Sequence, residues 1–261
     1  MAFTAFIASG LACACLAFAQ EASETATIRF AHLSPNVPVL EFELVPTEGE
    51  TLTLSDVAFE GITAYIEVVG GSHVARALDG EQVVFEEMLD FAPDTAYTVA
   101  LVGLALPDQS AANEEDEGFL DFVQDLLGGE EKDTLALRFL TFEERDSFPF
   151  DEGERLVRVV HASPGTDAVD VTAAGDDGRE VIIGGVAFGS VSAYDAVISG
   201  FQEPGLSLSG SETIMVDLSG LSFEPGTFNT LVLTGTPLEQ APLKVLLLQE
   251  TGQSAESPMG D

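Results

Sequence analysis

An internal duplication constrains the fold of this chain more than any other sequence feature. The segment Arg29-Phe30-Ala31-His32-Leu33-Ser34-Pro35 returns 129 residues later as Arg158-Val159-Val160-His161-Ala162-Ser163-Pro164. Further blocks match in the same order: 57–59 with 186–188, 64–65 with 193–194, 91–95 with 223–227, and Gly103 with Gly235. This spacing far exceeds the period of solenoid repeats, so each copy is predicted to be a whole domain.

Each copy is also predicted to consist of β-strands. Short runs rich in β-branched and aromatic residues alternate with Gly, Pro, Asp and Ser clusters, and they span residues 26–31, 96–102, 155–160, 180–183 and 229–233. Crossover helices are missing, which argues against a βαβ fold. We therefore expect an all-β protein of two tandem antiparallel β-sandwich domains, residues 27–145 and 155–251, joined by a linker at 146–154.

The first copy carries an insertion at about residues 108–134. Six apolar residues within it fall at helical spacing, and Gly128-Gly129 supplies a stop; the apolar residues are Phe119, Leu120, Phe122, Val123, Leu126 and Leu127. With the acidic run at 114–117, this pattern predicts a short amphipathic helix in an acidic insertion. Packing of its apolar face onto the first sandwich is favoured, and docking of a partner is the alternative.

The N-terminus resembles a secretory signal peptide. Residues 2–19 are apolar and end in Ala17-Phe18-Ala19, a pattern that signal peptidase cuts, so residues 1–19 are expected to be removed. Cys13 and Cys15 lie inside this segment, and the cleaved chain then has no cysteine for disulfides, thiol catalysis or zinc. Lipidation at Cys13 or Cys15 is the alternative. No later segment is apolar enough for stable membrane insertion, and residues 252–261 are expected to be a disordered tail.

The charge balance excludes some partners. The chain has 45 acidic and 9 basic residues and a formal net charge of −36, which argues against binding to nucleic acid or to an anionic membrane surface. Salt screens the repulsion within such a surface, so we interpret the acidity as an adaptation to saline surroundings. Hydrophobic residues make up 46% of the chain, which is enough to build a core.

The motifs of the second copy resemble a bacterial family. The run His161-Ala162-Ser163-Pro164, followed by Ala168-Val169-Asp170-Val171, Val186-Ala187-Phe188-Gly189 and Tyr194, is similar to the domain of unknown function 4397. The resemblance covers about 27–144 and 155–250. The first copy departs from it with Leu33 for Ala, Glu41-Phe42 for Asp-Val, and Glu60-Gly61 for Gly-Ser. It implies immunoglobulin-like sandwiches, a secreted, periplasmic or cell-surface location, and no established reaction.

The repeated histidines are interpreted as structural residues. His32 and His161 have the parity of the core-facing row in their strands, and the Ser-Pro that follows begins a turn. Each imidazole is expected to pack under that turn and to hydrogen-bond a backbone carbonyl or the serine hydroxyl. The signature positions with such a structural role are His32, Ser34, Pro35, Phe59, Tyr65, His161, Ser163, Pro164, Asp170, Phe188 and Tyr194.

A hydrolase is the sharper alternative. Ser163 would be the nucleophile, His161 its base, and Asp167 or Asp170 the orienting acid. The sequence argues against this: Ser163 precedes a proline, it lacks a Gly-x-Ser-x-Gly elbow, and no oxyanion site is evident nearby. We predict no catalytic residue, no cofactor-binding residue and no enzyme activity.

Metal sites are not predicted either. Three histidines spread over two domains do not make a zinc site, and His73 is read as a strand-edge residue. The acidic runs at 114–117 and 176–178 offer oxygen ligands for weak Ca²⁺ binding, but neither matches a calcium loop. We expect an exported, non-catalytic binding, adhesion or structural protein whose partner is an envelope protein or a polysaccharide. A hydrolase or a carbohydrate-binding accessory domain is the alternative, and a purely structural spacer is a third reading.

Overall fold

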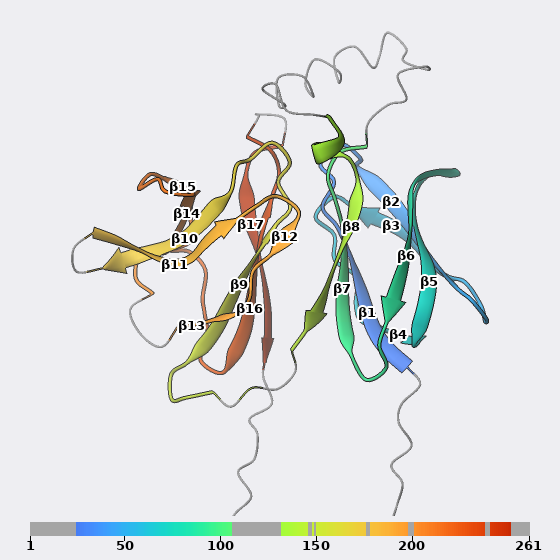
Figure 1. The fold of residues 1–261 in the computed structure, drawn as a ribbon, viewed down its shortest axis with the longest axis horizontal. Helices are drawn as coiled ribbons and strands as arrows, with labels where there is room; N and C mark the ends of the chain where they lie inside the picture. Colours follow the sequence, from blue (N-terminus) through green and yellow to red (C-terminus); the bar gives the residue numbers. More distant parts are fainter. Residues whose placement is uncertain are drawn as a thin grey trace, which may run out of the picture.

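The protein is built from strands. The computed structural model describes residues 25–105, 132–145, 148, 150–175, 178–197, 201–237 and 241–251. In the first half of the chain, the inner sheet has the order β4-β1-β7-β8 and the outer sheet the order β3-β2-β5-β6 (Figure 1). The strands are β1 (Thr25–His32), β2 (Val39–Pro46), β3 (Leu52–Ala58), β4 (Ile66–Val69), β5 (Gly71–Asp79), β6 (Gln82–Phe91), β7 (Ala96–Val102) and β8 (Arg138–Glu144).

The second half repeats this arrangement. Its inner sheet runs β12-β9-β16-β17, with β13 also paired to β9, and its outer sheet runs β11-β10-β14-β15. The strands are β9 (Arg155–His161), β10 (Val169–Gly175), β11 (Gly178–Val186), β12 (Ser190–Val191), β13 (Asp195–Val197), β14 (Gly205–Leu208), β15 (Ile214–Asp217), β16 (Thr227–Thr234) and β17 (Lys244–Thr251). The duplication seen in the sequence is therefore a duplication of topology.

The inner sheets are mixed rather than antiparallel, which corrects the predicted sheet type. β1 pairs with β7 in parallel, and β9 pairs with β16 in parallel. The cause is the path of the chain: after β1 it builds the outer sheet and returns to the edge where β1 began. There the amide of Asp94 donates to the carbonyl of Thr25 at 2.9 Å, so β7 starts beside the start of β1. The other pairings are antiparallel, and the immunoglobulin-like topology stays a prediction.

Each half has its own hydrophobic core between its two sheets. Alternate residues of each strand point inward, as the pleat requires. In the first half Phe30 stacks on Phe42 with ring centroids 4.9 Å apart, and both are fully buried. In the second half Val159, Val171 and Leu231 occupy the corresponding space and are fully buried.

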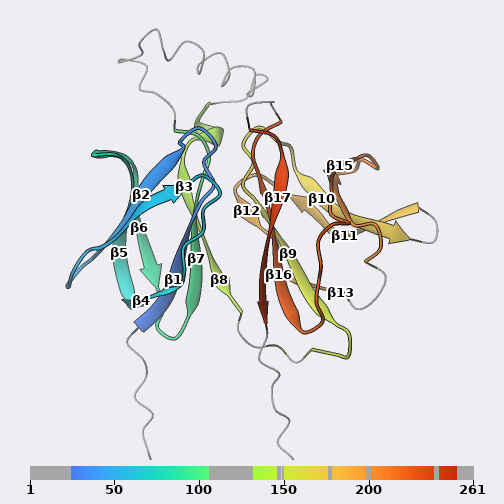
Figure 2. The same cartoon turned by 180° about the vertical axis from the view of Figure 1, so that it is seen from behind.

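A third core joins the two halves. The residues of opposite parity on the inner sheets lie on their outward faces, and these faces pack against each other in the middle of the molecule (Figures 1 and 2). The buried members are Ala31, Leu33, Ala100, Val102, Phe142, Val160, Ala162 and Val232. Both faces of each inner sheet are thus covered, and the order of layers is outer, inner, inner, outer.

The repeated glycines Gly103 and Gly235 have a steric reason. Gly103 follows β7 directly and has a φ of 94°, and Gly235 follows β16 directly and has a φ of 84°. A Cβ atom at Gly103 would lie 2.4 Å from the carbonyl oxygen of Ala136, and one at Gly235 would lie 2.4 Å from that of Pro242. Only glycine fits a backbone approach this close.

Several predictions concern residues that the structure does not describe. The signal peptide at 1–19, the amphipathic helix at 119–127, the acidic runs at 114–117 and 176–177, and the tail at 252–261 lie outside the described residues. The described part of the insertion ends in a short 3-10 helix, η1 (Lys132–Leu135), and no α-helix occurs among the described residues. Within the same residues, no helix is long and apolar enough to cross a lipid bilayer.

Candidate functional site

The histidine of the second copy closes the turn that follows β9. His161 Nε2 bonds the carbonyl oxygen of Asp167 at 3.1 Å, and its Nδ1 accepts from the amide of Ser163 at 3.3 Å. The Ser163 hydroxyl bonds Thr166 Oγ1 at 2.7 Å. His161 and Ser163 are both fully buried, and the ring of Phe188 packs edge-on against the imidazole at 6.0 Å. Pro164 begins the turn itself.

The first copy repeats this geometry. His32 Nε2 bonds the carbonyl oxygen of Val37 at 2.7 Å, and Nδ1 accepts from the amide of Ser34 at 3.4 Å. Phe59 packs edge-on against the ring at 6.0 Å, and Pro35 begins the turn. His32 and Ser34 are fully buried. The two turns therefore share one internal hydrogen-bond pattern.

Burial disfavours the protonated form of both imidazoles. It lowers the pKa of His32 to about 4, against the raising effect of the hydrogen bond to Val37. Burial also lowers the pKa of His161, against the backbone hydrogen bonds to Asp167 and Thr166. Neither ring nitrogen of either histidine faces a serine hydroxyl: one bonds a carbonyl and the other an amide. This pattern supports the structural reading of these residues.

Asp170 holds the backbone of β11 rather than a histidine. Its carboxylate accepts from the amides of Gly185 and Gly210 at 2.7 and 2.9 Å and from the Ser209 hydroxyl at 2.7 Å. Burial opposes ionisation of Asp170, but these three hydrogen bonds together lower its pKa. The bond to Gly185 stabilises a β-bulge, where the register between β10 and β11 shifts.

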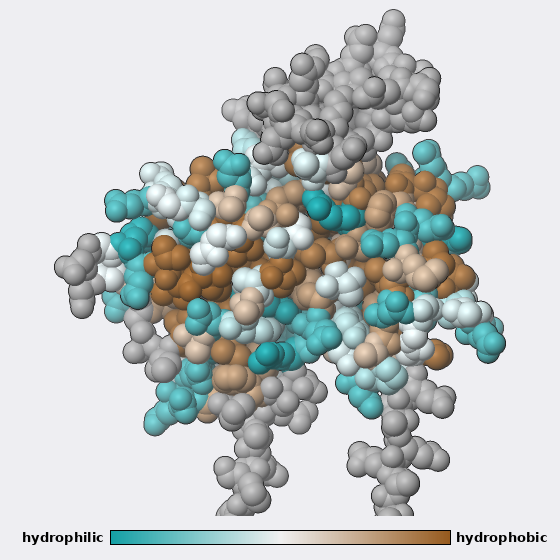
Figure 3. All heavy atoms as spheres, in the orientation of Figure 1, coloured by the Kyte–Doolittle hydropathy of each residue, from teal (hydrophilic) through white to brown (hydrophobic). Residues whose placement is uncertain are grey.

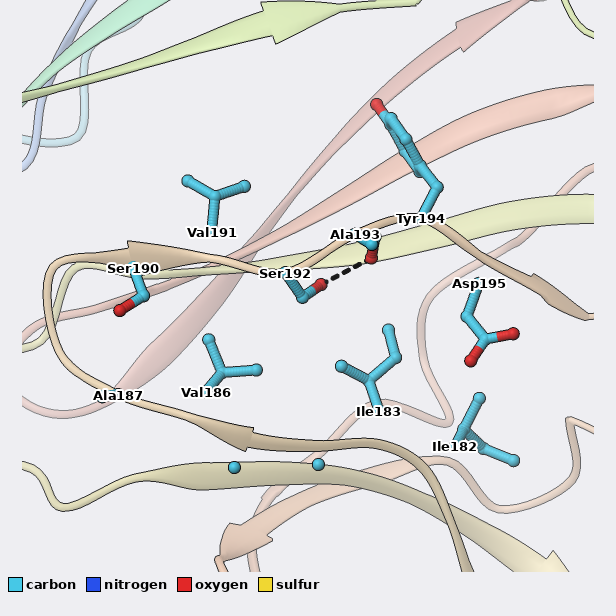
Figure 4. Close-up of a pocket in the computed structure, with 12 residues that line it drawn as sticks. Ile182, Ile183, Val186, Ala187, Ser190, Val191, Ser192, Ala193, Tyr194 and Asp195 are labelled. Atoms are coloured by element: carbon cyan, nitrogen blue, oxygen red, sulfur yellow. Dashed lines mark hydrogen bonds between the residues drawn. The ribbon is translucent and has the colours of Figure 1, made fainter.

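The bulge borders a candidate binding site, which we call the β11 groove. It has a volume of about 440 Å³ and is lined by residues 182–187 and 190–195. Figure 4 shows the side chains of Ile183 and Val186 on one wall, with Ser190, Ser192 and Asp195 directed toward them from the other. A groove of this volume is within the range of natural ligand sites.

The groove lies between two sheet edges. β11 is the last strand of the outer sheet, while β12 and β13 are at the edge of the inner sheet. Within the described residues no further strand pairs with the free side of β11. Figure 3 shows hydrophobic residues gathered over β11 on this face of the second half.

The first half carries different side chains at the matching positions. Ser55 and Asp56 stand where the groove has Gly184 and Gly185, and Ile66 stands where it has Asp195. The Ser55 hydroxyl donates to Glu41, the counterpart of Asp170, at 2.6 Å. The glycine pair and the acidic group of the groove are therefore specific to the second half.

Charged side chains form a second cluster, between the halves. The interface cluster consists of Arg29, Glu144, Arg158 and Glu250. Arg29 contacts Glu144 and Glu250, each at 2.8 Å, and Arg158 contacts Glu144. Both arginines are buried, and their Nε atoms donate to the matching threonines Thr98 and Thr230 at 2.8 and 2.9 Å.

The signature tyrosines complete the interface cluster rather than a core. Tyr65 lies under the Arg29 guanidinium at 4.6 Å and Tyr194 under that of Arg158 at 4.4 Å. The Tyr65 hydroxyl donates to Glu250 at 2.7 Å. Burial raises the pKa of Tyr65, and the hydrogen bond to Glu250 raises it further, so this hydroxyl stays a donor.

The arrangement at the interface is reciprocal. Arg29 of the first half meets Glu250 of the second, and Arg158 of the second meets Glu144 of the first. The two pairs are repeat-equivalent to each other, since Arg29 matches Arg158 and Glu250 matches Glu144, and this is the pattern of a twofold-related contact. The four charged residues of the interface cluster were not among the predicted positions. The available signal was that Arg29 and Arg158 occupy matching positions in a chain with only 9 basic residues.

His73, the third histidine of the chain, lies apart from both turns. His73 lies in β5, inside the outer sheet and not at its edge, because β5 pairs with both β2 and β6. It is buried, bonds the carbonyl of Gly71 at 3.0 Å and packs against Phe91. Across the described ranges, no three His, Cys, Asp or Glu side chains come together as a metal site.

Comparison with known proteins identifies a family match. The model of the family described as "Domain of unknown function (DUF4397)" matches residues 26–140 and 155–258. No curated protein matches this chain. A solved structure from Bacteroides eggerthii DSM 20697, named a "putative cell adhesion protein", is 10% identical over 88% of this chain and 96% of its own. Its TM-score is 0.21, and it supports neither a fold nor a function here.

Proposed function

Because the chain belongs to the DUF4397 family in both of its halves, we propose that it is an exported, non-catalytic binding protein of the cell envelope. The first half acts as a rigid support, and the second half presents the binding surface. The partner is a component of the envelope. Residues 1–19 direct export and are removed.

The β11 groove is the observation that carries this proposal. It places the apolar side chains of Ile183 and Val186 opposite hydroxyl and carboxylate groups, so a ligand could make both kinds of contact there. The residues that would make a hydrolase, Ser163 and His161, are buried and bonded within a turn. A nucleophile must reach its substrate, so the burial of Ser163 favours a structural role over a catalytic one.

Binding to isolated envelope tests the proposal. Labelled residues 20–261 are expected to bind envelope from the producing cell saturably, and unlabelled protein is expected to compete. Ala187→Trp places a bulky ring in the groove and is expected to weaken binding at least tenfold. The matched control is Ala58→Trp, at the exposed repeat-equivalent position of the first half, which leaves binding unchanged. Binding that does not saturate, or that both variants weaken equally, would contradict the proposal.

A hydrolase screen tests the non-catalytic part. The wild-type chain is expected to turn over no ester, peptide or glycoside substrate. Turnover that Ser163→Ala abolishes, in a variant that still folds, would overturn the proposal and restore the hydrolase interpretation.

A further inference from the structure

The free side of β11 is a strand edge to which no strand is paired among the described residues. Natural edge strands are commonly protected by charged residues, proline, β-bulges or short length, because their unpaired amides and carbonyls can pair with another chain. β11 has Arg179 and Glu180 near its start and the bulge at Gly184-Gly185 near its end, so the open part of the edge lies between them. β11 has nine residues, and its centre Val181-Ile182-Ile183 has no charge. Val181 is 53% exposed and does not line the groove, whereas Ile182 and Ile183 do. This strand therefore offers unpaired backbone groups next to the apolar wall of the groove.

The groove also has space for the side chains of an added strand. Ile183 and Val186 both face inward because the bulge at Gly184-Gly185 shifts the register. A strand that pairs with β11 points every second side chain into the space between the sheets, where these residues form an apolar wall. Glycine in a strand is typical where another backbone comes close.

The opposite wall is less suited to pairing. β12 and β13 are short and interrupted between Val191 and Asp195. The Ser192 hydroxyl in this interruption is already bonded to the amide of Val159 and the carbonyl of Ala193, at 2.9 and 2.8 Å. This wall therefore supplies polar contacts, of which the exposed Asp195 carboxylate is the charged one.

Charge selects the occupant. A second copy of this chain would bring another formal charge of −36 to the groove, whereas a basic segment is attracted by Asp195 and by the whole molecule. We propose that the β11 groove binds an extended, basic segment of a partner polypeptide, which adds as a strand to β11. Its inward side chains contact Ile183 and Val186, and a lysine or arginine pairs with Asp195. This inference rests on the proposed function and names its partner class.

Synthetic peptides test the strand pairing. The probe is an eight-residue peptide of alternating Val and Thr with Lys at both ends, titrated into residues 20–261 by calorimetry. Two further peptides carry N-methyl groups on alternate residues, one set along each edge of the strand. One set removes the donors that face β11 and is expected to abolish binding, while the other set leaves the affinity within about twofold. Equal binding of all three peptides would overturn the proposal.

Protein variants test the charge contact. Asp195→Asn is expected to weaken binding of the lysine peptide about threefold to fivefold, the range of an exposed ion pair. Asp79→Asn removes the same charge at an exposed position in the first half and is expected to leave the affinity unchanged. A peptide with Glu in place of Lys is expected not to bind. If the two variants behave alike, the attraction is nonspecific and the proposal fails.

The outcome separates this inference from the proposed function. If no peptide binds at about 1 mM while envelope binding stays saturable and sensitive to Ala187→Trp, strand addition is wrong and the binding role stands. If the chain instead dimerises and β11 amides become protected in the dimer, the occupant is a second copy and the basic partner is wrong.

Discussion

At the scale of single residues, the buried histidines couple stability to pH. The unfolded chain takes up a proton on His32 near its ordinary pKa of 6.5, whereas the folded chain does so near 4. Between these values the unfolded state binds more protons, so acidification favours unfolding. Stability from this histidine is complete above pH 6.5 and is lost as the pH falls toward 4.

We predict that the titration of His32 alone lowers the free energy of unfolding by about 3 kcal/mol as the pH falls from 6.5 to 4. Urea denaturation of the wild-type chain and of His32→Gln at a series of pH values measures this. The glutamine amide can still donate to the Val37 carbonyl but does not titrate, so the variant lacks this part of the slope. Parallel pH profiles for the two proteins would contradict the prediction.

At the scale of elements, the bulge in β11 depends on Asp170. Its carboxylate satisfies two backbone amides and one hydroxyl, from Gly185, Gly210 and Ser209. The bulge aims Ile183 and Val186 into the groove, so this one side chain links the edge of the outer sheet to the candidate site.

Asp170→Asn is expected to destabilise the protein by about 1–3 kcal/mol, because an amide cannot accept all three hydrogen bonds. The amides of Gly185 and Gly210 should exchange with deuterium faster than in the wild type. The control is Glu41→Gln at the matching position of the first half, where the carboxylate accepts from the exposed Ser55. If Glu41→Gln lowered the free energy of unfolding as much as Asp170→Asn does, the loss could not be attributed to the three hydrogen bonds of Asp170, and the prediction would be wrong.

The strands also show which features of the fold could be predicted from the sequence. The repeat at 129 residues and strand parity predicted an all-β fold and the burial of His32 and His161, because a two-residue period is visible in one strand. Parallel pairing of β1 with β7 depends on where the chain returns after about sixty residues, which local patterns do not encode. The interface cluster could not be predicted because the residue pattern of a strand does not show whether its outward face meets solvent or another sheet. Arg29 and Arg158 are charged, and charged residues in a strand are usually at the surface.

At the scale of the whole molecule, the interface cluster couples the two halves. Glu144 is the carboxylate that both arginines share, and Arg158 has no other carboxylate partner among the contacts of the described residues. The Arg158 side chain is 5% exposed, so its charge is held in a poorly solvated place. The third core touches this cluster, because the Arg158 guanidinium lies over the ring of Phe142 at 4.6 Å.

Glu144→Gln is expected to lower the free energy of unfolding by about 3 kcal/mol or more, because it leaves Arg158 buried without its counter-charge. Calorimetry should show one unfolding transition in the wild type and two in this variant, as the halves separate before they unfold. Glu86→Gln removes an exposed partner of Arg76 and should leave the melting temperature unchanged. A single, unshifted transition in Glu144→Gln would show that the halves do not depend on this charge.

The charge of the whole chain gives a further prediction. Dispersed carboxylates repel one another, and salt screens exposed charges more than buried pairs. The melting temperature should therefore rise from low salt to about 1 M NaCl, as scanning calorimetry can measure. A flat profile would remove the interpretation of the acidity as an adaptation to saline surroundings.

The reciprocal contact of Arg29 with Glu250 and of Arg158 with Glu144 bears on how the protein acquired one distinct site. A homodimer of a single ancestral unit would meet through the same face, and any mutation in it would alter both subunits at once. Gene fusion removes that constraint while keeping the contact. The two units can then carry different residues at matching positions: Ser55, Asp56 and Ile66 in the first half, and Gly184, Gly185 and Asp195 in the second. Covalent linkage thus allowed asymmetry to arise within a symmetric assembly.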